Sequence, residues 1–358
     1  MTLSAAQKGE RTFARAFLAW TVTLFVLTIT LEILVNPWAD FSLPFYLVKP
    51  LNYSYRVEKL QLLKKLGQKS PEVFILGSST VMRMNPLTVE RLTASRTFNF
   101  GVLDAMPEDY YMITRHVIDD LEIKPAAIIL GLDPLSFRGD DSRVVRYADD
   151  VYDFFSLPDL LQYLDVQDRP DQWEIMWKKL RATIDKKYLS DTVASIFITV
   201  SGKKYVHFFE LDENGFAKYS QADFKISRGV FNFESELRQQ ARLWRNRYSQ
   251  MRDLSPVRKR YFEKFLKLCQ ENNIRLFVFI TPMQDGLQEI LERSRTYGPA
   301  SAMVRGYLQD MKEKYGFRLF DFTDVESFGG QDIDFYDGVH FGYKNSDLIL
   351  KKILEWTR

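Results

Sequence analysis

The sequence predicts an α/β protein built around a parallel sheet and preceded by one membrane-spanning helix. Three observations indicate this fold class: a long apolar segment near the N-terminus, five short apolar segments further on, and helix-forming segments between those five. Apolar runs of about four to eight residues are typical of strands buried on both faces, and helices alternating with them indicate parallel pairing. With 358 residues, 46% of them hydrophobic, the chain can bury a large core.

Residues 16–35, AFLAWTVTLFVLTITLEILV, are the first element, a predicted transmembrane anchor. They contain one charged residue, Glu32. A helix of this length reaches about 30 Å, the thickness of a bilayer's hydrocarbon core. Basic residues outnumber acidic ones in residues 1–15, so the positive-inside rule predicts a cytoplasmic N-terminus and a main domain outside the cytoplasm. A buried core helix is the alternative interpretation of the same segment.

The five predicted strands are short apolar runs, each followed by polar or turn-forming residues. They are residues 73–76, 96–102, 126–132, 275–281 and 318–324. Helices are expected at residues 104–123 and 299–315 and after Ser255-Pro256, which supply an N-cap and a proline at the first helical position. Such sheets bind ligands at the carboxyl ends of their strands, which is where Gly77-Ser78-Ser79-Thr80 follows the first strand.

The alternation of strands and helices is interrupted between the third and fourth strands. Residues 138–254 are far longer than an ordinary crossover and begin with the acidic, tyrosine-rich stretch GDDSRVVRYADDVYDFF. A helix near Trp173 and Trp177 and a hairpin turning at Asn214-Gly215 follow. We expect an inserted lid or subdomain here. The α/β domain then comprises residues 71–137 and 255–358, and residues 36–70 connect it to the anchor.

Composition excludes several classes of function. The net charge of +2 provides no overall field that would recruit nucleic acid, and the single cysteine, Cys269, rules out an intramolecular disulfide. The sequence has no nucleotide-binding glycine motif and no metal-ligand spacing, so we expect neither a cofactor nor a metal. Of the three histidines, His116 and His207 are expected to be structural, which leaves His340 for chemistry.

Ser79, His340 and Asp337 are the candidate catalytic residues. A histidine that acts as a general base needs a carboxylate to hold its tautomer and stabilise the imidazolium, and the D-x-x-H spacing of Asp337 and His340 can bring both to one edge. Each residue also has a purely structural interpretation. Ser79 can cap the helix that follows the first strand, and Asp337-Gly338 can be an ordinary turn.

With these motifs the sequence resembles the SGNH, or GDSL-type, hydrolases. The resemblance covers roughly residues 70–137 and 270–358. It is carried by Gly77-Ser78-Ser79 after the first strand, Gly101 in NFG, GLDP at 131–134, and Asp337 with His340. It implies a flavodoxin-like sandwich with about five parallel strands. With the anchor, the chain is most similar to the branch that contains the D-alanyl-lipoteichoic acid biosynthesis protein DltD and the partner proteins of polysaccharide O-acetylation.

The resemblance also implies roles for individual residues. Ser79 is the nucleophile, and its backbone N–H forms an oxyanion hole with the N–H of Gly101 and an asparagine of the third motif. Here Asp133 stands at the asparagine position, and an ionised carboxylate cannot donate a hydrogen bond. Three possibilities stay open: Asp133 is protonated, it orients another group such as Arg83, or the hole uses two backbone N–H groups. Gly101 can instead serve a tight turn, and Asp133-Pro134 can simply end a strand.

The implied function is that of a membrane-anchored esterase or O-acyltransferase outside the cytoplasm. Its substrate would be a bacterial envelope polysaccharide or a teichoic-acid-like polymer, and a multi-pass membrane acyltransferase is a possible partner. The alternative is a non-catalytic SGNH-like scaffold that binds the polymer or assembles such a complex. In the arginine-rich segment 238–260, the candidate polymer contacts are Arg238, Arg242, Arg245 and Arg247, although charge runs are commonly solvated helix faces.

Overall fold

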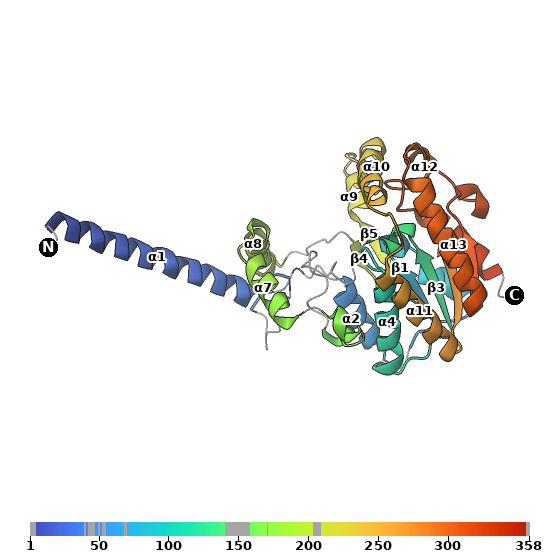
Figure 1. The fold of residues 1–358 in the computed structure, drawn as a ribbon, viewed down its shortest axis with the longest axis horizontal. Coiled ribbons are helices and arrows are strands. Elements are labelled where there is room, and N and C mark those ends of the chain that lie inside the picture. The colour runs from blue at the N-terminus through green and yellow to red at the C-terminus, as the bar shows by residue number, and fades with distance from the viewer. Residues whose placement is uncertain are drawn as a thin grey trace. The chain divides into compact units, whose positions relative to one another are not determined.

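The computed structural model describes residues 5–38, 41, 47–48, 51, 55–67, 70–139, 158–169, 171–202 and 209–355. These residues form two compact units (Figure 1). The first unit contains the N-terminal helix α1, Ala5–Val35, together with α7, Gln172–Ala182, and α8, Lys186–Ser201. The second unit contains all the other described helices and strands.

The second unit is built on a five-stranded parallel sheet, which confirms the predicted α/β class. In spatial order its strands are β2 Thr97–Asn99, β1 Val73–Gly77, β3 Ala127–Leu132, β6 Arg275–Ile280 and β7 Arg318–Asp321. All five predicted strands are present, although β2 and β7 are shorter than the apolar runs that predicted them. β1 and β3 are buried along their whole length because they lie inside the sheet and helices cover both of its faces.

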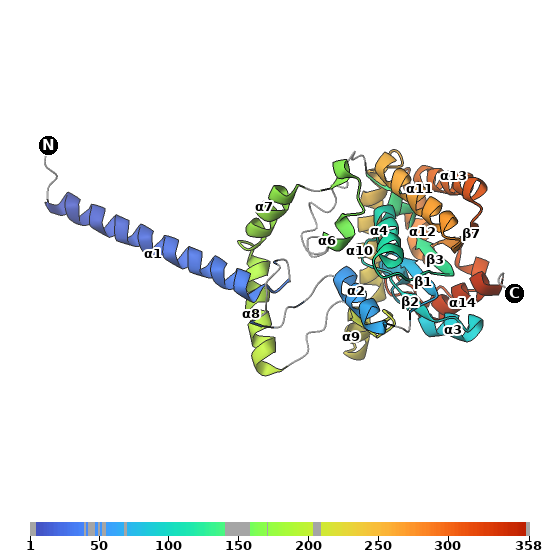
Figure 2. The same cartoon turned by 90° about the horizontal axis from the view of Figure 1, so that it is seen from below.

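Helices cover both faces of this sheet (Figure 2). One layer consists of α3 Pro86–Thr93 and α14 Tyr343–Leu354, whose Val89 and Ile349 share a core with Ile75 and Ile129 of the strands. The other layer is formed by α4 Pro107–Asp119, α11 Pro256–Glu271 and α13 Tyr297–Tyr315. Further helices of the unit include α2 Tyr55–Leu66, α6 Pro158–Leu161 and α12 Asp285–Glu292 and the short 3-10 helices η1 Ser79–Val81, η2 Pro134–Phe137, η3 Val166–Asp168 and η4 Val325–Phe328.

Local sequence signals account for the ends of several helices. Ser255 caps α11, its Oγ accepting from the Arg258 N–H at 3.4 Å, and Pro256 occupies the first turn as expected. Gly316 ends α13 in the left-handed conformation, φ 74°. The helix expected at 104–123 is shorter, because Pro107 begins α4 and the chain leaves it at Asp120.

The predicted insertion, 138–254, does not form a single subdomain. Its α7 and α8 belong to the first unit, whereas the hairpin β4 Phe209–Leu211 and β5 Ala217–Ser220 and the helices α9 Gln221–Ser227 and α10 Phe233–Ser249 belong to the second. The hairpin turns at Asn214-Gly215 as predicted, and the Asn214 carbonyl accepts from the Asn99 N–H at the end of β2. The acidic stretch predicted to open the insertion lies, except for Gly139, outside the described residues.

Helix α1 has the properties expected of the anchor. Its segment Arg11–Val35, 25 residues, is long and apolar enough to cross a membrane, and little of it is buried. Side chains such as Phe17, Trp20 and Phe25 are exposed along it. A core helix of a soluble protein would instead cover these side chains, so the core-helix alternative is not supported.

Candidate active site

Ser78 and Ser79 occupy different positions in the turn that follows β1. Ser78 is the N-cap of η1, and its Oγ lies 3.0 Å from Thr80 Oγ1 and accepts from the Thr80 N–H. Ser79 begins η1 and does not cap it. The capping role that was an alternative for Ser79 therefore belongs to its neighbour, and the Ser79 hydroxyl can make a different contact.

Three glycines hold this turn over the carboxyl edge of the sheet. A Cβ placed on Gly77, Gly101 or Gly131 would come within 2.9, 2.6 or 2.3 Å of a Val81 methyl group. Gly77 also has φ +145°, and its Cβ would meet the Gly131 carbonyl at 2.4 Å. The Val81 side chain therefore occupies a space that exists only because three adjacent strand ends carry glycine. This packing fixes the η1 turn, and with it Ser79.

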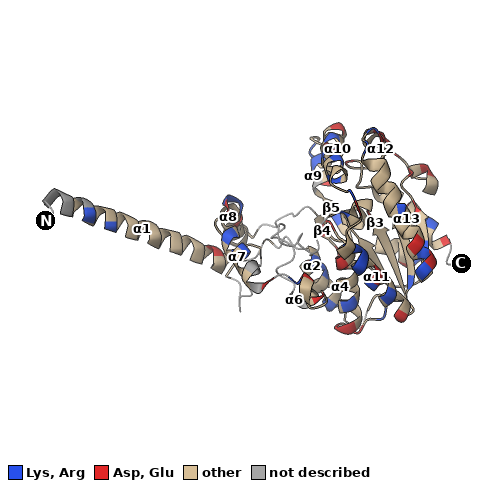
Figure 3. Cartoon of the chain, viewed as in Figure 1, with Lys and Arg blue, Asp and Glu red and all other residues tan. Residues whose placement is uncertain are grey.

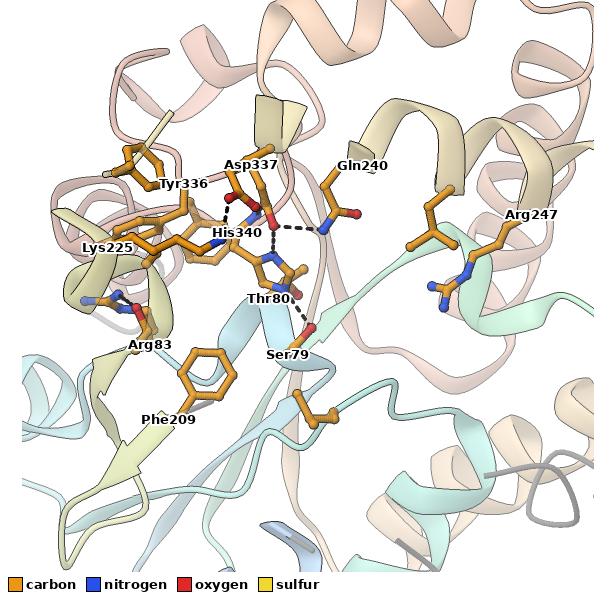
Figure 4. A pocket seen from close by; sticks show the side chains of 17 residues that line it. Ser79, Thr80, Arg83, Phe209, Lys225, Gln240, Arg247, Tyr336, Asp337 and His340 are labelled. Carbon is orange, nitrogen blue, oxygen red and sulfur yellow. Dashed lines mark hydrogen bonds and ion pairs between the residues drawn. The ribbon is translucent and has the colours of Figure 1, made fainter. Parts of the chain in front are cut away.

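Ser79, His340 and Asp337 form a continuous hydrogen-bonded chain (Figure 4). Ser79 Oγ lies 2.8 Å from His340 Nε2, and His340 Nδ1 lies 2.7 Å from Asp337 Oδ2. Asp337 Oδ1 also accepts from the backbone N–H groups of His340 and Val339, at 2.9 and 3.2 Å. The fold thus brings the three predicted residues together from turns that are 261 residues apart.

The pair of His340 and Asp337 is tuned by mutual charge stabilisation. Burial by itself would raise the pKa of Asp337, but the His340 charge and the hydrogen bonds from His340 and Val339 lower it overall. Burial by itself would lower the pKa of His340, but the Asp337 carboxylate, helped by the charge of Asp133, raises it overall. Asp337 is therefore held ionised beside a histidine that has become a stronger base.

Gln240 is a member of this site that the sequence did not predict. Its Nε2 donates to Asp337 Oδ2 at 2.9 Å, the same oxygen that contacts His340 Nδ1. Gln240 lies on α10, 97 residues before Asp337. A lone glutamine on a polar helix carries no signal in the sequence, so only the packing of α10 reveals this contact.

The backbone N–H groups expected to form the oxyanion hole differ in their availability. Gly101 N–H donates to Asn99 Oδ1 at 2.8 Å, so the oxyanion role predicted for Gly101 is not supported by this geometry. Ser79 N–H has no acceptor among the described residues. The Gly101 N–H is engaged because the side chain of the buried Asn99, two residues earlier, accepts its hydrogen bond.

Asn99 connects the turn after β1 with the segment that contains Gly101, and this role was not predicted from the sequence. Its Nδ2 donates to the carbonyls of Val81 and Met84, at 2.7 and 2.8 Å, and thereby anchors the end of η1. Lys59 of α2 is fully buried and donates to the Asn99 carbonyl at 2.9 Å. Burial lowers the pKa of Lys59 well below its ordinary value. A polar residue between the apolar neighbours in FNFG was the available signal for this role.

Asp133 is buried and caps η2. Its Oδ1 accepts from the Leu135 N–H at 2.8 Å, and burial raises its pKa to about 6. Asp133 does not orient Arg83, which was one of the three possibilities. Arg83 instead forms an ion pair with Asp223 at 2.8 Å, and its guanidinium stacks 4.5 Å from the ring of Tyr336.

A pocket of about 540 Å³ opens onto Ser79 and His340. Much of its wall comes from the predicted insertion, through the hairpin, α9 and α10. Its apolar lining includes Leu103, Phe209, Phe231, Leu243 and Phe341. Charged lining residues include Arg247 and the ion-paired Lys225 and Glu236. The pocket is therefore mainly apolar and has a few polar groups, which is typical of a small-molecule or chain-end binding site.

The four arginines predicted to contact a polymer lie on different sides of α10. Arg238, Arg242 and Arg245 recur at spacings that place them on one exposed face. Gln240, Leu243 and Arg247 line the pocket, about half a turn away around the helix. Only Arg247 therefore belongs to the site, and it lies 3.8 Å from Asp104.

His116 does not line this site. His116 Nδ1 lies 2.6 Å from Asp120, one turn along at the end of α4, which fits the structural role expected for it. His207 lies outside the described residues. In the part of the chain that the structure describes, no group of three or more His, Cys, Asp or Glu side chains could hold a metal ion.

Together the fold and the site define an α/β protein with a Ser-His-Asp arrangement at the carboxyl edge of a parallel sheet. Residues 45–354 match the family described as "Protein of unknown function (DUF1574)". Because the match spans most of the chain, the chain belongs to this family. The comparison with curated proteins found no match.

Proposed function

We propose that this chain is a membrane-anchored SGNH-type esterase or O-acyltransferase. The observation that carries the proposal is the hydrogen-bonded chain from Ser79 through His340 to Asp337. Two further features support it. The strand order β2-β1-β3-β6-β7 matches the flavodoxin-like order, and the serine stands at the carboxyl edge of the central strands, where such sheets bind ligands.

The first half of the reaction uses Ser79 as the nucleophile. Ser79 Oγ attacks the carbonyl carbon of an ester while His340 Nε2 takes the hydroxyl proton, and Asp337 stabilises the imidazolium that forms. The N–H of Ser79, the first residue of η1, donates a hydrogen bond to the oxyanion that forms. When the tetrahedral intermediate collapses, the leaving alcohol takes the proton from His340, and an acyl-serine remains.

The second half of the reaction decides between hydrolysis and transfer. A water molecule or an acceptor hydroxyl loses its proton to His340 Nε2 and attacks the acyl-serine. Ser79 then leaves with the proton that His340 returns, and the products are an acid or a new ester. The largely apolar pocket suits the acyl portion of a donor, and Arg247 on its wall suits an anionic group on the donor or acceptor.

The proposed acceptor is a polymer of the bacterial cell envelope, either a polysaccharide or a teichoic-acid-like chain, reached from an anchor that crosses the membrane. The basic residues before the span favour, by the positive-inside rule, a cytoplasmic N-terminus and an α/β unit outside, where a multi-pass acyltransferase would supply the acyl group. A phosphatase fused after Arg358 should be active only if that end is outside the cytoplasm. A cytoplasmic reporter that is active at the same position would refute this orientation.

A second candidate function, a non-catalytic scaffold, is favoured by a specific observation. The Gly101 N–H is engaged by Asn99, and Asp133 at the donor position is a carboxyl group that accepts from Leu135. A site with one backbone donor for the oxyanion is weaker than a site with two or three. In this reading the pocket binds a polymer end or contributes to an acyltransferase complex without forming an acyl-enzyme.

A fluorophosphonate serine probe distinguishes the two functions. The detergent-solubilised full-length chain is incubated with the probe, and Ser78→Ala and Ser79→Ala serve as a matched pair. The enzyme proposal expects covalent labelling of the wild type and of Ser78→Ala but not of Ser79→Ala. If the folded wild-type chain is not labelled, the enzyme proposal fails and the scaffold takes its place.

A further inference from the structure

Helix α8 buries its polar side. Its buried residues recur at helical spacing and are Tyr188, Asp191, Thr192 and Ser195. They face the end of the chain's first helix. Trp38, three residues beyond α1, donates from Nε1 to Asp191 Oδ2 at 2.8 Å, and its ring lies 4.4 Å from that of Tyr188. Polar groups therefore join α8 to the segment that follows the candidate membrane span.

The other side of α8 is apolar and exposed. Leu189, Val193, Phe197 and Val200 follow one another at spacings of four, four and three residues, and their exposed fractions are 45%, 61%, 59% and 82%. A surface helix of a soluble protein shows the opposite arrangement, with its apolar side toward the core. The polarity of α8 is therefore inverted, as expected for a helix whose outer surroundings are themselves apolar.

Helix α7 adds groups that are typical of a membrane surface. Trp173 and Trp177, four residues apart, are both exposed, at 69% and 68%. Residues 178–187, from the end of α7 into α8, contain five Lys or Arg against one acidic residue, Asp185. Figure 3 shows this basic colouring on α7 and α8. Tryptophan is enriched at bilayer interfaces, and basic residues are attracted to anionic headgroups.

The position of α8 at the end of the candidate span is the position expected for a helix at a membrane surface. Figure 2 shows α8 crossing the C-terminal end of α1, with which it is in contact, where the candidate span Arg11–Val35 ends. With 16 residues, α8 is about 24 Å long, too short to cross a bilayer itself. Its exposed apolar face therefore lies close to the end of the candidate span.

We propose that α7 and α8 form a lipid-bound platform. The apolar face of α8 and the Trp173 and Trp177 rings of α7 lie at the boundary between headgroups and acyl chains, and basic residues of 178–186 contact anionic headgroups, whereas Lys187 pairs with Asp191. The partner is the bilayer surface and not a protein, because the face lies close to the end of a segment that is itself suited to lipid. This inference requires α1 to span the membrane and is independent of any catalytic activity of Ser79.

Nitroxide labels measure the depth of this face directly. Val193→Cys and Val200→Cys are labelled in the full-length chain reconstituted alone into nanodiscs of phosphatidylcholine and phosphatidylglycerol. Ile333→Cys, at a position 89% exposed in the second unit, is the aqueous control, and the unsubstituted chain, whose one cysteine is the buried Cys269, is the labelling blank. We expect labels at 193 and 200 to collide more with oxygen than with a soluble nickel chelate, and the label at 333 to show the reverse.

An aqueous collision pattern at both 193 and 200 would overturn the proposal and leave the face for a protein partner. A second measurement needs no label. Lipids brominated near the headgroup should quench part of the tryptophan fluorescence, and Trp173→Phe with Trp177→Phe should remove part of that quenched signal. If the double substitution leaves the quenched amplitude unchanged, α7 does not lie at the interface and the proposal fails.

Discussion

Replacing Ser79 and His340, singly and together, tests whether they act as one unit. Both residues belong to the same hydrogen-bonded chain. Ser79 Oγ lies 2.8 Å from His340 Nε2, and His340 Nδ1 lies 2.7 Å from Asp337 Oδ2. Without the nucleophile the base has nothing to activate, and without the base the hydroxyl keeps its proton. Ser79→Ala and His340→Ala should each lower kcat for a small activated ester on the order of 10⁴-fold or more. The double variant should be no slower than either single one.

Stability separates this result from simple unfolding. Ser79→Ala removes one partly exposed hydrogen bond, worth about 1 kcal/mol, so Tm should shift by only a few degrees. Ser78→Ala, which removes the η1 cap, is the matched control. It should cost about 1 kcal/mol as well and keep most of the activity. Losses that multiply in the double variant, or a Ser79→Ala protein that is fully active, would refute the reasoning.

Three further predictions concern the groups around this chain. A general base works in its unprotonated form, and Asp337 raises the pKa of His340, so kcat/KM should decrease as the pH falls, with a midpoint above the ordinary histidine pKa of about 6.5. Asp337→Asn should move that midpoint to lower pH. A midpoint that does not move would contradict the assignment of His340 as the base. Asp133→Asn keeps an acceptor for the Leu135 N–H, adds a donor and removes a charge that raises the His340 pKa. Ester hydrolysis at neutral pH should therefore rise, by up to about 100-fold if the new donor reaches the oxyanion, and a fall would show that the carboxylate has another role. Arg247→Ala should raise KM for an anionic ester more than for a neutral one. Replacing Arg238, Arg242 and Arg245 together by Gln should leave both KM values unchanged. If the triple replacement raises KM as much as Arg247→Ala does, the three exposed arginines also contact the substrate.

The sequence was sufficient for features that depend on local pattern. Five apolar runs predicted the five strands of the sheet, because a strand covered on both faces has to be apolar along its length, although the edge strand β7 is only partly buried. The serine turn and the D-x-x-H segment could be named because so few histidines are present and because each motif directly follows or precedes a recognisable element. The helix that is long and apolar enough to span a membrane was predictable from length and composition alone, since a bilayer sets both.

Tertiary structure decided the features that depend on contacts between distant residues. Gln240 reaches Asp337 only because α10 packs beside the turn of residues 336–340, and no local pattern marks a glutamine for that contact. The Gly101 amide is engaged by Asn99, whose side-chain direction is set by Val81, Met84 and Lys59 together. A sequence lists which groups can donate and accept, but their partners follow from packing.

The difference between local pattern and tertiary contact also accounts for which arginines line the pocket and for which side of α8 is buried. Composition marked a basic segment, yet helical rotation places Arg247 at the pocket and Arg238 on another face. The sequence of α8 contains an apolar stripe and a polar stripe, either of which could face inward. The fold buries the polar stripe, and a buried carboxylate needs partners, which Asp191 finds in Trp38 Nε1 from outside the helix and in Lys187 Nζ.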